Sequence, residues 1–230
     1  FDDVSDINEF LIEFFSDKNL YIPFPAVIVN HIGVDYTNCV HSFNRVLNDI
    51  FEDDLVNLFS TSESSIDVNL DEDYDTFFNF ASGVFPVDNN LSISLTNEVK
   101  TIIKDFPIKI TRLSNKNYFL SKIFTGKKVQ NNHILNVKQP KQTLFYGRLL
   151  AGIVNKKTGA FAANHSYYDS SKIKEYFNNN TSSKVYPYFE NCSNLIRMYP
   201  IMSPSKIFIF IKVIVKNKIC ISKKIRLKSP

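Results

Sequence analysis

Residues 91–95 read Leu-Ser-Ile-Ser-Leu, and this short stretch carries the clearest signal for the fold class. Its strict alternation of apolar and polar residues is typical of a β-strand with one face buried and the other in water. The strands predicted after it share this alternation or an apolar run, and they span residues 108–113, 131–137, 143–154, 159–168, 185–189, 194–202, 206–215 and 218–227. Because short turns join several of them, the pattern predicts an antiparallel β-sandwich or jelly-roll-like core over about residues 91–228.

The stretch from Ile207 to Val215 is the longest apolar run among these strands, interrupted by Lys212 alone. A strand that is apolar at both alternating sets of positions is typical of the middle of a sheet, so a central strand is predicted here. A helix needs about 20 apolar residues to cross a bilayer. No run in this chain reaches that length, so no transmembrane segment is predicted.

Helical spacing is concentrated in the N-terminal part of the chain. Apolar residues recur every three or four positions over residues 6–15 and again over residues 37–59. This spacing predicts two amphipathic helices. The segment 60–75 is rich in Ser and in carboxylates, so an exposed acidic loop is expected there.

Two further helices are predicted within the strand-rich part. One runs from Thr96 to Phe106 and is ended by Pro107, and the other covers residues 170–177. The chain as a whole is therefore expected to be α+β. An acidic, helix-rich N-terminal region would span residues 1–90, and a basic, β-rich domain would span residues 91–230.

The overall charge of +4 conceals a strong separation of charge along the chain. Residues 1–100 carry 19 acidic and three basic side chains, whereas residues 101–230 carry 24 basic and four acidic ones. Halves of opposite sign attract each other, either within one molecule or between molecules. A basic half with interleaved aromatic residues also suits nucleic acid or an anionic membrane surface. A solvated basic face is the simpler alternative.

Neither a cofactor nor a metal site is predicted. The four His and three Cys residues show no metal-ligand spacing, and the glycine-rich loops that bind phosphate are absent. Ser166, His165 and Asp169 lie close together in the sequence. Sequential residues of a strand point to opposite faces, however, so they do not meet as nucleophile and base. We therefore expect that the protein is not an enzyme.

One order of segments points to a known family. A strand-like stretch at 144–154 is followed by a turn and by a second strand that leads to Asp169. A segment containing Pro200 then precedes the long apolar strand at 207–215. This order resembles the core of the plant-virus cell-to-cell movement protein superfamily, over about residues 140–228.

The resemblance implies both a fold and a function. In that family a pair of hydrophobic strands leads to a nearly invariant Asp, and Asp169 takes that position here. The implied protein has a β fold related to the jelly roll, is not an enzyme and binds single-stranded RNA. It also associates with membranes and acts in the host cytoplasm and at plasmodesmata. Asp169 would then be structural, accepting hydrogen bonds from turn amides at a strand end.

Candidate nucleic-acid contacts follow from the basic half of the chain. Basic side chains neutralise phosphates and aromatic rings stack on bases. The candidate phosphate contacts are Lys127, Lys128, Arg148, Lys156, Lys157, Lys172 and Lys174. The candidate stacking residues are Tyr146, Tyr167, Tyr168, Tyr186 and Tyr188.

Three other functions remain open on the sequence. The first is a viral structural protein, a coat or minor capsid subunit with the same β architecture, whose oppositely charged halves would mediate self-association. The second is a β-rich host-interaction protein that does not bind nucleic acid. The third is a divergent metal-dependent nuclease, for which Asp169 near Lys172 is the best match.

Overall fold

The structure is a computed structural model, and its described residues form two compact units. The first unit is Phe1–Tyr168 and the second is Asp169–Pro230. The structure describes residues 17, 27–41, 62–81, 86–97, 101–112, 114–126, 129, 131, 133–138, 149–168, 186, 189, 193, 207–216 and 218–227. The predicted helices at 6–15 and 170–177 lie outside these residues.

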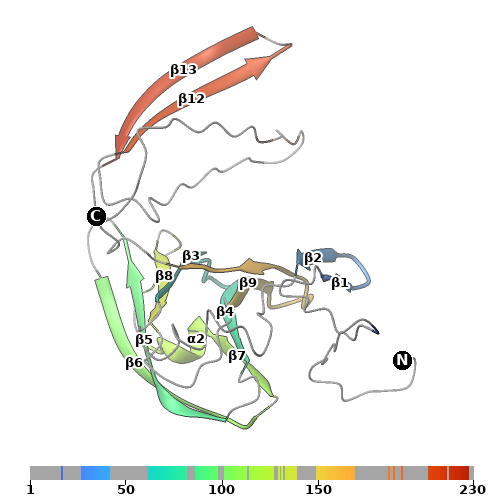
Figure 1. Ribbon diagram of the computed structural model, residues 1–230, viewed down its shortest axis with the longest axis vertical. Coiled ribbons are helices and arrows are strands. Elements are labelled where there is room, and N and C mark those ends of the chain that lie inside the picture. The colour runs from blue at the N-terminus through green and yellow to red at the C-terminus, as the bar shows by residue number, and fades with distance from the viewer. Residues whose placement is uncertain are drawn as a thin grey trace. The chain divides into compact units, whose positions relative to one another are not determined.

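The first unit is built on two antiparallel sheets (Figure 1). The four-stranded sheet has the order β10 (Phe161–His165), β9 (Leu150–Asn155), β4 (Tyr74–Ala81) and β7 (Asn115–Phe119). The five-stranded sheet has the order β11 (Tyr167–Tyr168), β3 (Ser62–Asp67), β8 (Ile134–Lys138), β5 (Val87–Thr96) and β6 (Thr101–Ile110). The β-rich, sandwich-like architecture predicted from the sequence is therefore confirmed.

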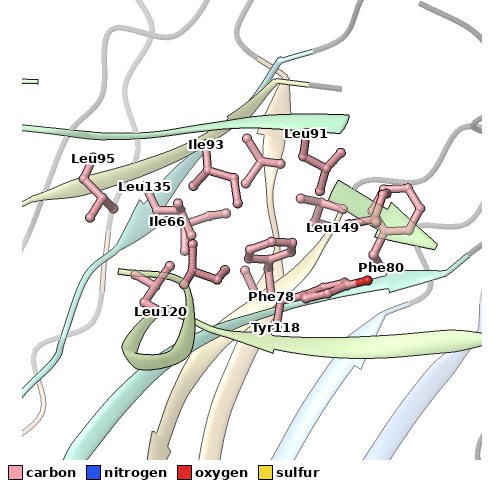
Figure 2. Packing of buried hydrophobic residues seen from close by; sticks show 14 of the residues in the cluster. Ile66, Phe78, Phe80, Leu91, Ile93, Leu95, Tyr118, Leu120, Leu135 and Leu149 are labelled. Atoms are coloured by element: carbon pink, nitrogen blue, oxygen red, sulfur yellow. The ribbon is translucent and has the colours of Figure 1, made fainter. Parts of the chain in front are cut away.

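The inner faces of the two sheets form one hydrophobic core. Leu91, Ile93 and Leu95 of β5 are fully buried, while the serines between them are partly exposed, as the alternation predicts. From the other sheet Phe78 points into the same space, and its ring stacks on Tyr118 with 5.4 Å between centroids (Figure 2). Full burial of each such side chain contributes about 1.5–3 kcal/mol, so this layer is the main source of stability.

A single helical turn, α2 (Leu120–Ile123), follows β7 and places its two apolar ends in the core. Its ends are held by charged side chains from other strands. The Asp75 carboxylate accepts hydrogen bonds from the Ser121 hydroxyl and from the Ser121 backbone N–H, the latter at 3.2 Å. The Lys104 ammonium donates to the Ile123 carbonyl. Backbone groups that so short a helix leaves unpaired thus gain partners.

A hairpin of β1 (Ile28–Ile32) and β2 (Thr37–His41) lies beside β10. The Asn38 side-chain oxygen accepts a hydrogen bond of 3.1 Å from the Ala163 backbone N–H. The predicted helix over residues 37–59 is therefore wrong for residues 37–41, the part that the structure describes. Pairing with β1 satisfies the backbone there, and the β-branched Val40 is buried.

The predicted acidic loop at 60–75 is also wrong for most of its described length. Residues 62–67 form β3, which pairs with β8 and β11. Ile66 and Val68 alternate into the core, and Glu63 is completely buried. Hydrogen bonds to two neighbouring strands thus outweigh the loop-like composition. Residues 68–73 remain outside the strands, with bends at 71–73 directly before β4.

The helix predicted from Thr96 to Phe106 is wrong as well for its described residues, 96–97 and 101–106. Residues 101–110 form β6, which pairs with β5 along its whole length. Pro107 lies inside this strand instead of ending a helix. β6 is the last strand of its sheet, so one of its edges has no neighbouring strand. Proline has no backbone N–H to donate, and it is therefore tolerated in an edge strand of this kind.

The division into units falls after Tyr168, whereas the sequence-based division falls after residue 90. Strands β3 and β4 belong to the same two sheets as β5 to β9. The second unit contains a hairpin of β12 (Ile207–Val215) and β13 (Lys218–Leu227), drawn in red in Figure 1. Among the described residues β12 pairs with β13 alone, so the prediction of a central strand is wrong.

Candidate nucleic-acid interface

The structure describes four of the predicted nucleic-acid contacts in the first unit. Lys156 and Lys157 lie in the turn between β9 and β10. The backbones of Tyr167 and Tyr168 form β11, where they pair with Ser64 and Glu63. Tyr186, in the second unit, is described and exposed. The remaining candidates lie outside the described residues: Lys127, Lys128, Arg148, Lys172, Lys174, Tyr146, Tyr188 and the structural candidate Asp169.

The β9–β10 turn holds the two lysines at its tip. The Asn155 side-chain oxygen accepts hydrogen bonds from the backbone N–H groups of Lys157 (2.9 Å) and Thr158 (3.1 Å). This is the local turn that an Asn side chain favours. Gly159 closes the turn with a φ of 74°, a conformation that glycine adopts at little cost.

This turn contacts the acidic turn at residues 71–73. The Lys157 ammonium lies 2.5 Å from the Asp73 carboxylate, and the Lys156 ammonium donates to the Asp71 carbonyl at 2.5 Å. The Lys156 backbone N–H also donates to the Asp73 carbonyl at 2.8 Å. A phosphate group that approached these lysines would have to displace a carboxylate and a carbonyl. At this position opposite charges are therefore paired within one molecule.

The acidic turn is shaped by Asp71. Its carboxylate accepts hydrogen bonds from the backbone N–H groups of Tyr74 (2.8 Å) and Asp73 (2.9 Å). The Tyr74 bond is the largest cause that lowers the pKa of Asp71 below its ordinary value of 3.8, although partial desolvation opposes the shift. The Asn131 amide adds a weaker contact at 3.5 Å. The Asp71 carboxylate therefore stabilises the shape of this turn.

A buried polar group lies where β11 approaches β3. The Ser166 hydroxyl donates a hydrogen bond to the Glu63 carboxylate and accepts one of 2.8 Å from the Leu149 backbone N–H. The His165 Nδ1 lies 2.9 Å from the Ser166 carbonyl oxygen. The hydroxyl and the imidazole thus make separate contacts. The sequence analysis did not identify Glu63 as a buried residue. It lies in a stretch rich in Ser and carboxylates, and no alternation of apolar and polar residues there indicates which side chains are buried.

A hollow of about 250 Å³ lies next to this polar group, between β3, β9 and β10. Its lining is mostly apolar, with one carboxylate, one amide and one imidazole from Asp67, Asn164 and His165. Gly152 forms part of the wall. A Cβ at that position would lie 2.1 Å from the Ala162 carbonyl oxygen, so only glycine lets β10 approach β9 so closely.

Neither a metal-binding cluster nor a membrane-spanning helix occurs within the described ranges. No group of three or more His, Cys, Asp or Glu side chains is gathered there in a way that would hold a metal ion. None of the helices in the described part of the chain is long and apolar enough to cross a membrane.

The second unit carries the strongest basic character of the chain. Residues 169–230 contain 12 basic and three acidic side chains, and no acidic residue follows Glu190. Within the hairpin the side chains of Lys212, Lys216 and Lys218 are exposed. The candidate residues chosen from the sequence did not include these three lysines. The absence of carboxylates after residue 190 is the signal that could have identified them.

Comparisons with known proteins give no family for this chain. No protein-family model, no curated protein and no solved structure matches it. The functional argument therefore rests on strand order, on charge and on the contacts described above.

Proposed function

We propose that this chain is a non-enzymatic viral protein that binds single-stranded nucleic acid and is built on a jelly roll. The order of the strands in the two sheets is the observation that carries the proposal. The charge of the second unit indicates which part of the chain meets the nucleic acid.

The strand order supports the jelly-roll assignment pair by pair. A jelly roll is a long antiparallel hairpin of eight strands that wraps into two sheets. Its strands pair second with seventh, third with sixth and fourth with fifth. If β3 is the second strand, the corresponding pairs are β3–β8, β4–β7 and β5–β6, and all three occur. Wrapping then adds β4–β9 and β5–β8, which also occur, and β10 takes the place of the first strand beside β9.

The jelly roll links the two viral functions considered from the sequence. It is the architecture of many viral capsid domains, and the resemblance to movement proteins implies a related β fold. Both kinds of protein handle a viral genome, which is a polyanion. The excess of basic side chains in residues 169–230 would attract the phosphates and release their counterions on binding.

The experiment is a titration of a fluorescent single-stranded oligonucleotide with the full chain across a salt series. We expect binding that weakens linearly in a plot of log affinity against log salt concentration, since phosphate contacts dominate. A double-stranded oligonucleotide of the same sequence is the control for strand preference. Absence of binding at low salt would overturn the proposal.

A coat or minor capsid subunit is the second candidate, and the jelly-roll strand order favours it equally. A capsid subunit assembles into large closed particles, whereas a movement-type protein coats the nucleic acid in small units. Sedimentation velocity of the full chain with and without oligonucleotide separates the two. Particles that form without nucleic acid would favour the capsid function.

A further inference from the structure

Strand β1 has one open edge in the described part of the chain, because it pairs there with β2 alone. Ile28, Asn30 and Ile32 alternate along this strand and are all exposed. The two isoleucines are exposed by 65% and 78%, which is unusual for side chains of this kind. An open strand edge presents a row of backbone N–H and C=O groups with which another chain can pair.

The β1–β2 hairpin is held on the four-stranded sheet by its other face. The His31 ring meets the Phe161 ring of β10 edge-on, with 5.2 Å between centroids. Asn38, directly opposite His31, accepts a hydrogen bond from a backbone N–H of β10. Side chains alternate between the two faces of a strand, so the neighbours of His31 in β1, Asn30 and Ile32, lie on the face that points away from β10. A second strand could therefore pair with β1 without displacing the hairpin.

Strand β1 lacks the residues that protect other outer strands of this molecule. β6 contains Pro107, and β7 contains Lys116. Proline and lysine in an edge strand both discourage pairing with another molecule. β1 reads Ile-Val-Asn-His-Ile, with no Pro, Lys, Arg, Asp or Glu. Neither a missing N–H nor a charge of these residues therefore opposes the approach of a second strand.

The ladder between β1 and β2 indicates which backbone groups point to the open edge. At the end of the hairpin the Gly33 N–H donates to the Tyr36 carbonyl at 2.9 Å. Hydrogen-bonded and non-hydrogen-bonded pairs alternate along an antiparallel ladder. Ile32, Asn30 and Ile28 therefore occupy non-hydrogen-bonded positions opposite β2. Their N–H and C=O groups point away from β2, to the open edge.

We propose that two copies of this chain pair through β1, antiparallel and around a two-fold axis at Asn30. This register places the two Asn30 residues opposite each other and each Ile28 opposite an Ile32. All the backbone groups that point to the open edge then gain partners. The sequence of β1 is thus complementary to itself, which favours a second copy of the chain over an unrelated peptide. This inference is independent of nucleic-acid binding by the chain.

The side chains add to this pairing and limit its size. Each pair of Ile28 with Ile32 removes apolar area from water. The two Asn30 amides are able to hydrogen-bond to each other. Because β2 occupies the other edge of β1, pairing closes at two copies. Only five residues of each copy take part, so we expect a weak, reversible dimer.

The first test is sedimentation equilibrium of the full chain without nucleic acid, over a range of protein concentrations. At about 0.15 M salt, charges more than about 8 Å apart are largely screened, so attraction between the oppositely charged units contributes little. We expect an equilibrium between monomer and dimer. A chain that stays monomeric at its highest soluble concentration overturns the proposal.

Substitution of Asn30 tests whether β1 is the contact. In the proposed register Asn30→Lys places two lysines opposite each other, and Asn30→Asp places two carboxylates there. Like charges in direct opposition destabilise a strand pair, so we expect each variant alone to lose about tenfold or more in dimer affinity. Thr37→Lys is the matched control, since Thr37 is exposed on the same face of the hairpin but lies on β2. An equal loss in the control overturns the proposal.

A mixture of the two Asn30 variants gives a readout that a folding defect cannot imitate. A lysine opposite an aspartate replaces repulsion with attraction. We therefore expect an equimolar mixture of Asn30→Lys and Asn30→Asp to dimerise, although each variant alone does not. A mixture that stays monomeric overturns the proposal. So does a wild-type dimer affinity in either variant alone.

Discussion

Gly152 is a residue at which the four-stranded sheet leaves no room for a side chain. The space that a Cβ would need is occupied by backbone atoms of β10, which cannot move aside like the end of a side chain. Gly126 offers a contrast, because it has a φ of 72° but nothing within 4 Å of the Cβ position. One glycine is thus required by contact and the other by conformation.

We expect Gly152→Ala to lower the free energy of unfolding by about 1–3 kcal/mol, the usual cost of overpacking. Gly126→Ala is the comparison, and its cost is that of the backbone conformation alone, about 1 kcal/mol. Urea unfolding of both variants measures the difference. A wild-type midpoint for Gly152→Ala would contradict the close approach of β10 to β9.

Asp71 gives a prediction about pH. Its pKa is lowered in the folded protein, so its carboxylate stabilises the fold above pH 3.8. That contribution disappears as the pH falls from 3.8 through the lower pKa of the folded state. Asp71→Asn keeps an oxygen that accepts the turn hydrogen bonds but cannot titrate. We therefore expect a smaller loss of thermal stability in the variant over this pH range, and identical losses would contradict the role of Asp71.

Among the elements, β6 shows how an edge strand is protected. It is the last strand of its sheet and contains Pro107, and Lys104 points inward to hold the end of α2. A proline and an inward-pointing charge both discourage pairing with a strand of another molecule. Pro107, expected from the sequence to end a helix, therefore acts together with Lys104 to discourage pairing at this edge.

We expect Lys104→Met to lower the free energy of unfolding by about 1 kcal/mol, because the Ile123 carbonyl loses a charged donor. Lys109→Met on the same strand is the matched control. Lys109 is highly exposed and pairs with Asp88 at 3.4 Å, an ion pair of the kind that contributes little. Urea unfolding tests both variants. Equal effects would mean that the contact with α2 does not stabilise the fold.

The β9–β10 turn gives a prediction about oligonucleotide binding. Lys156 and Lys157 already contact the turn at residues 71–73. We expect the double variant Lys156→Gln, Lys157→Gln to leave the salt dependence of oligonucleotide binding unchanged. If both lysines contacted phosphates, the slope of log affinity against log salt would fall by about 1.4, because each phosphate contact on a single strand contributes about 0.7. A fall of that size would return this turn to the nucleic-acid interface.

For the whole molecule, the two compact units differ in the sign of their charge. Phe1–Tyr168 has a net charge of −5 and Asp169–Pro230 one of +9. Units of opposite sign on neighbouring molecules attract each other at low ionic strength, and salt screens this attraction. We expect association of the full chain beyond a dimer at low salt that is lost as salt is added. Sedimentation velocity without nucleic acid measures it, and association beyond a dimer that persists at high salt would indicate an apolar interface instead.

The sequence predicted the β-rich fold because alternation is a local signal, and Leu91 to Leu95 carry it without interruption. The errors arose where non-local pairing decided the structure. Ile102 and Phe106 are four residues apart, which fits one face of a helix as well as one face of a strand. Pairing of β6 with β5 settled that ambiguity. The contact of Lys157 with Asp73 joins residues far apart in the chain, so no spacing rule could have indicated it.

The position of β10 beside β9 has a consequence for how the chain folds. The two strands are joined by residues 156–160, so this edge of the sheet is completed by a local hairpin. An N-terminal strand in that place would have to find its partner across most of the unit, and pairing over long sequence separations is slow. We therefore expect β10 to pair with β9 soon after β9 joins the four-stranded sheet. The strand pairing that completes this edge joins only residues 150–165.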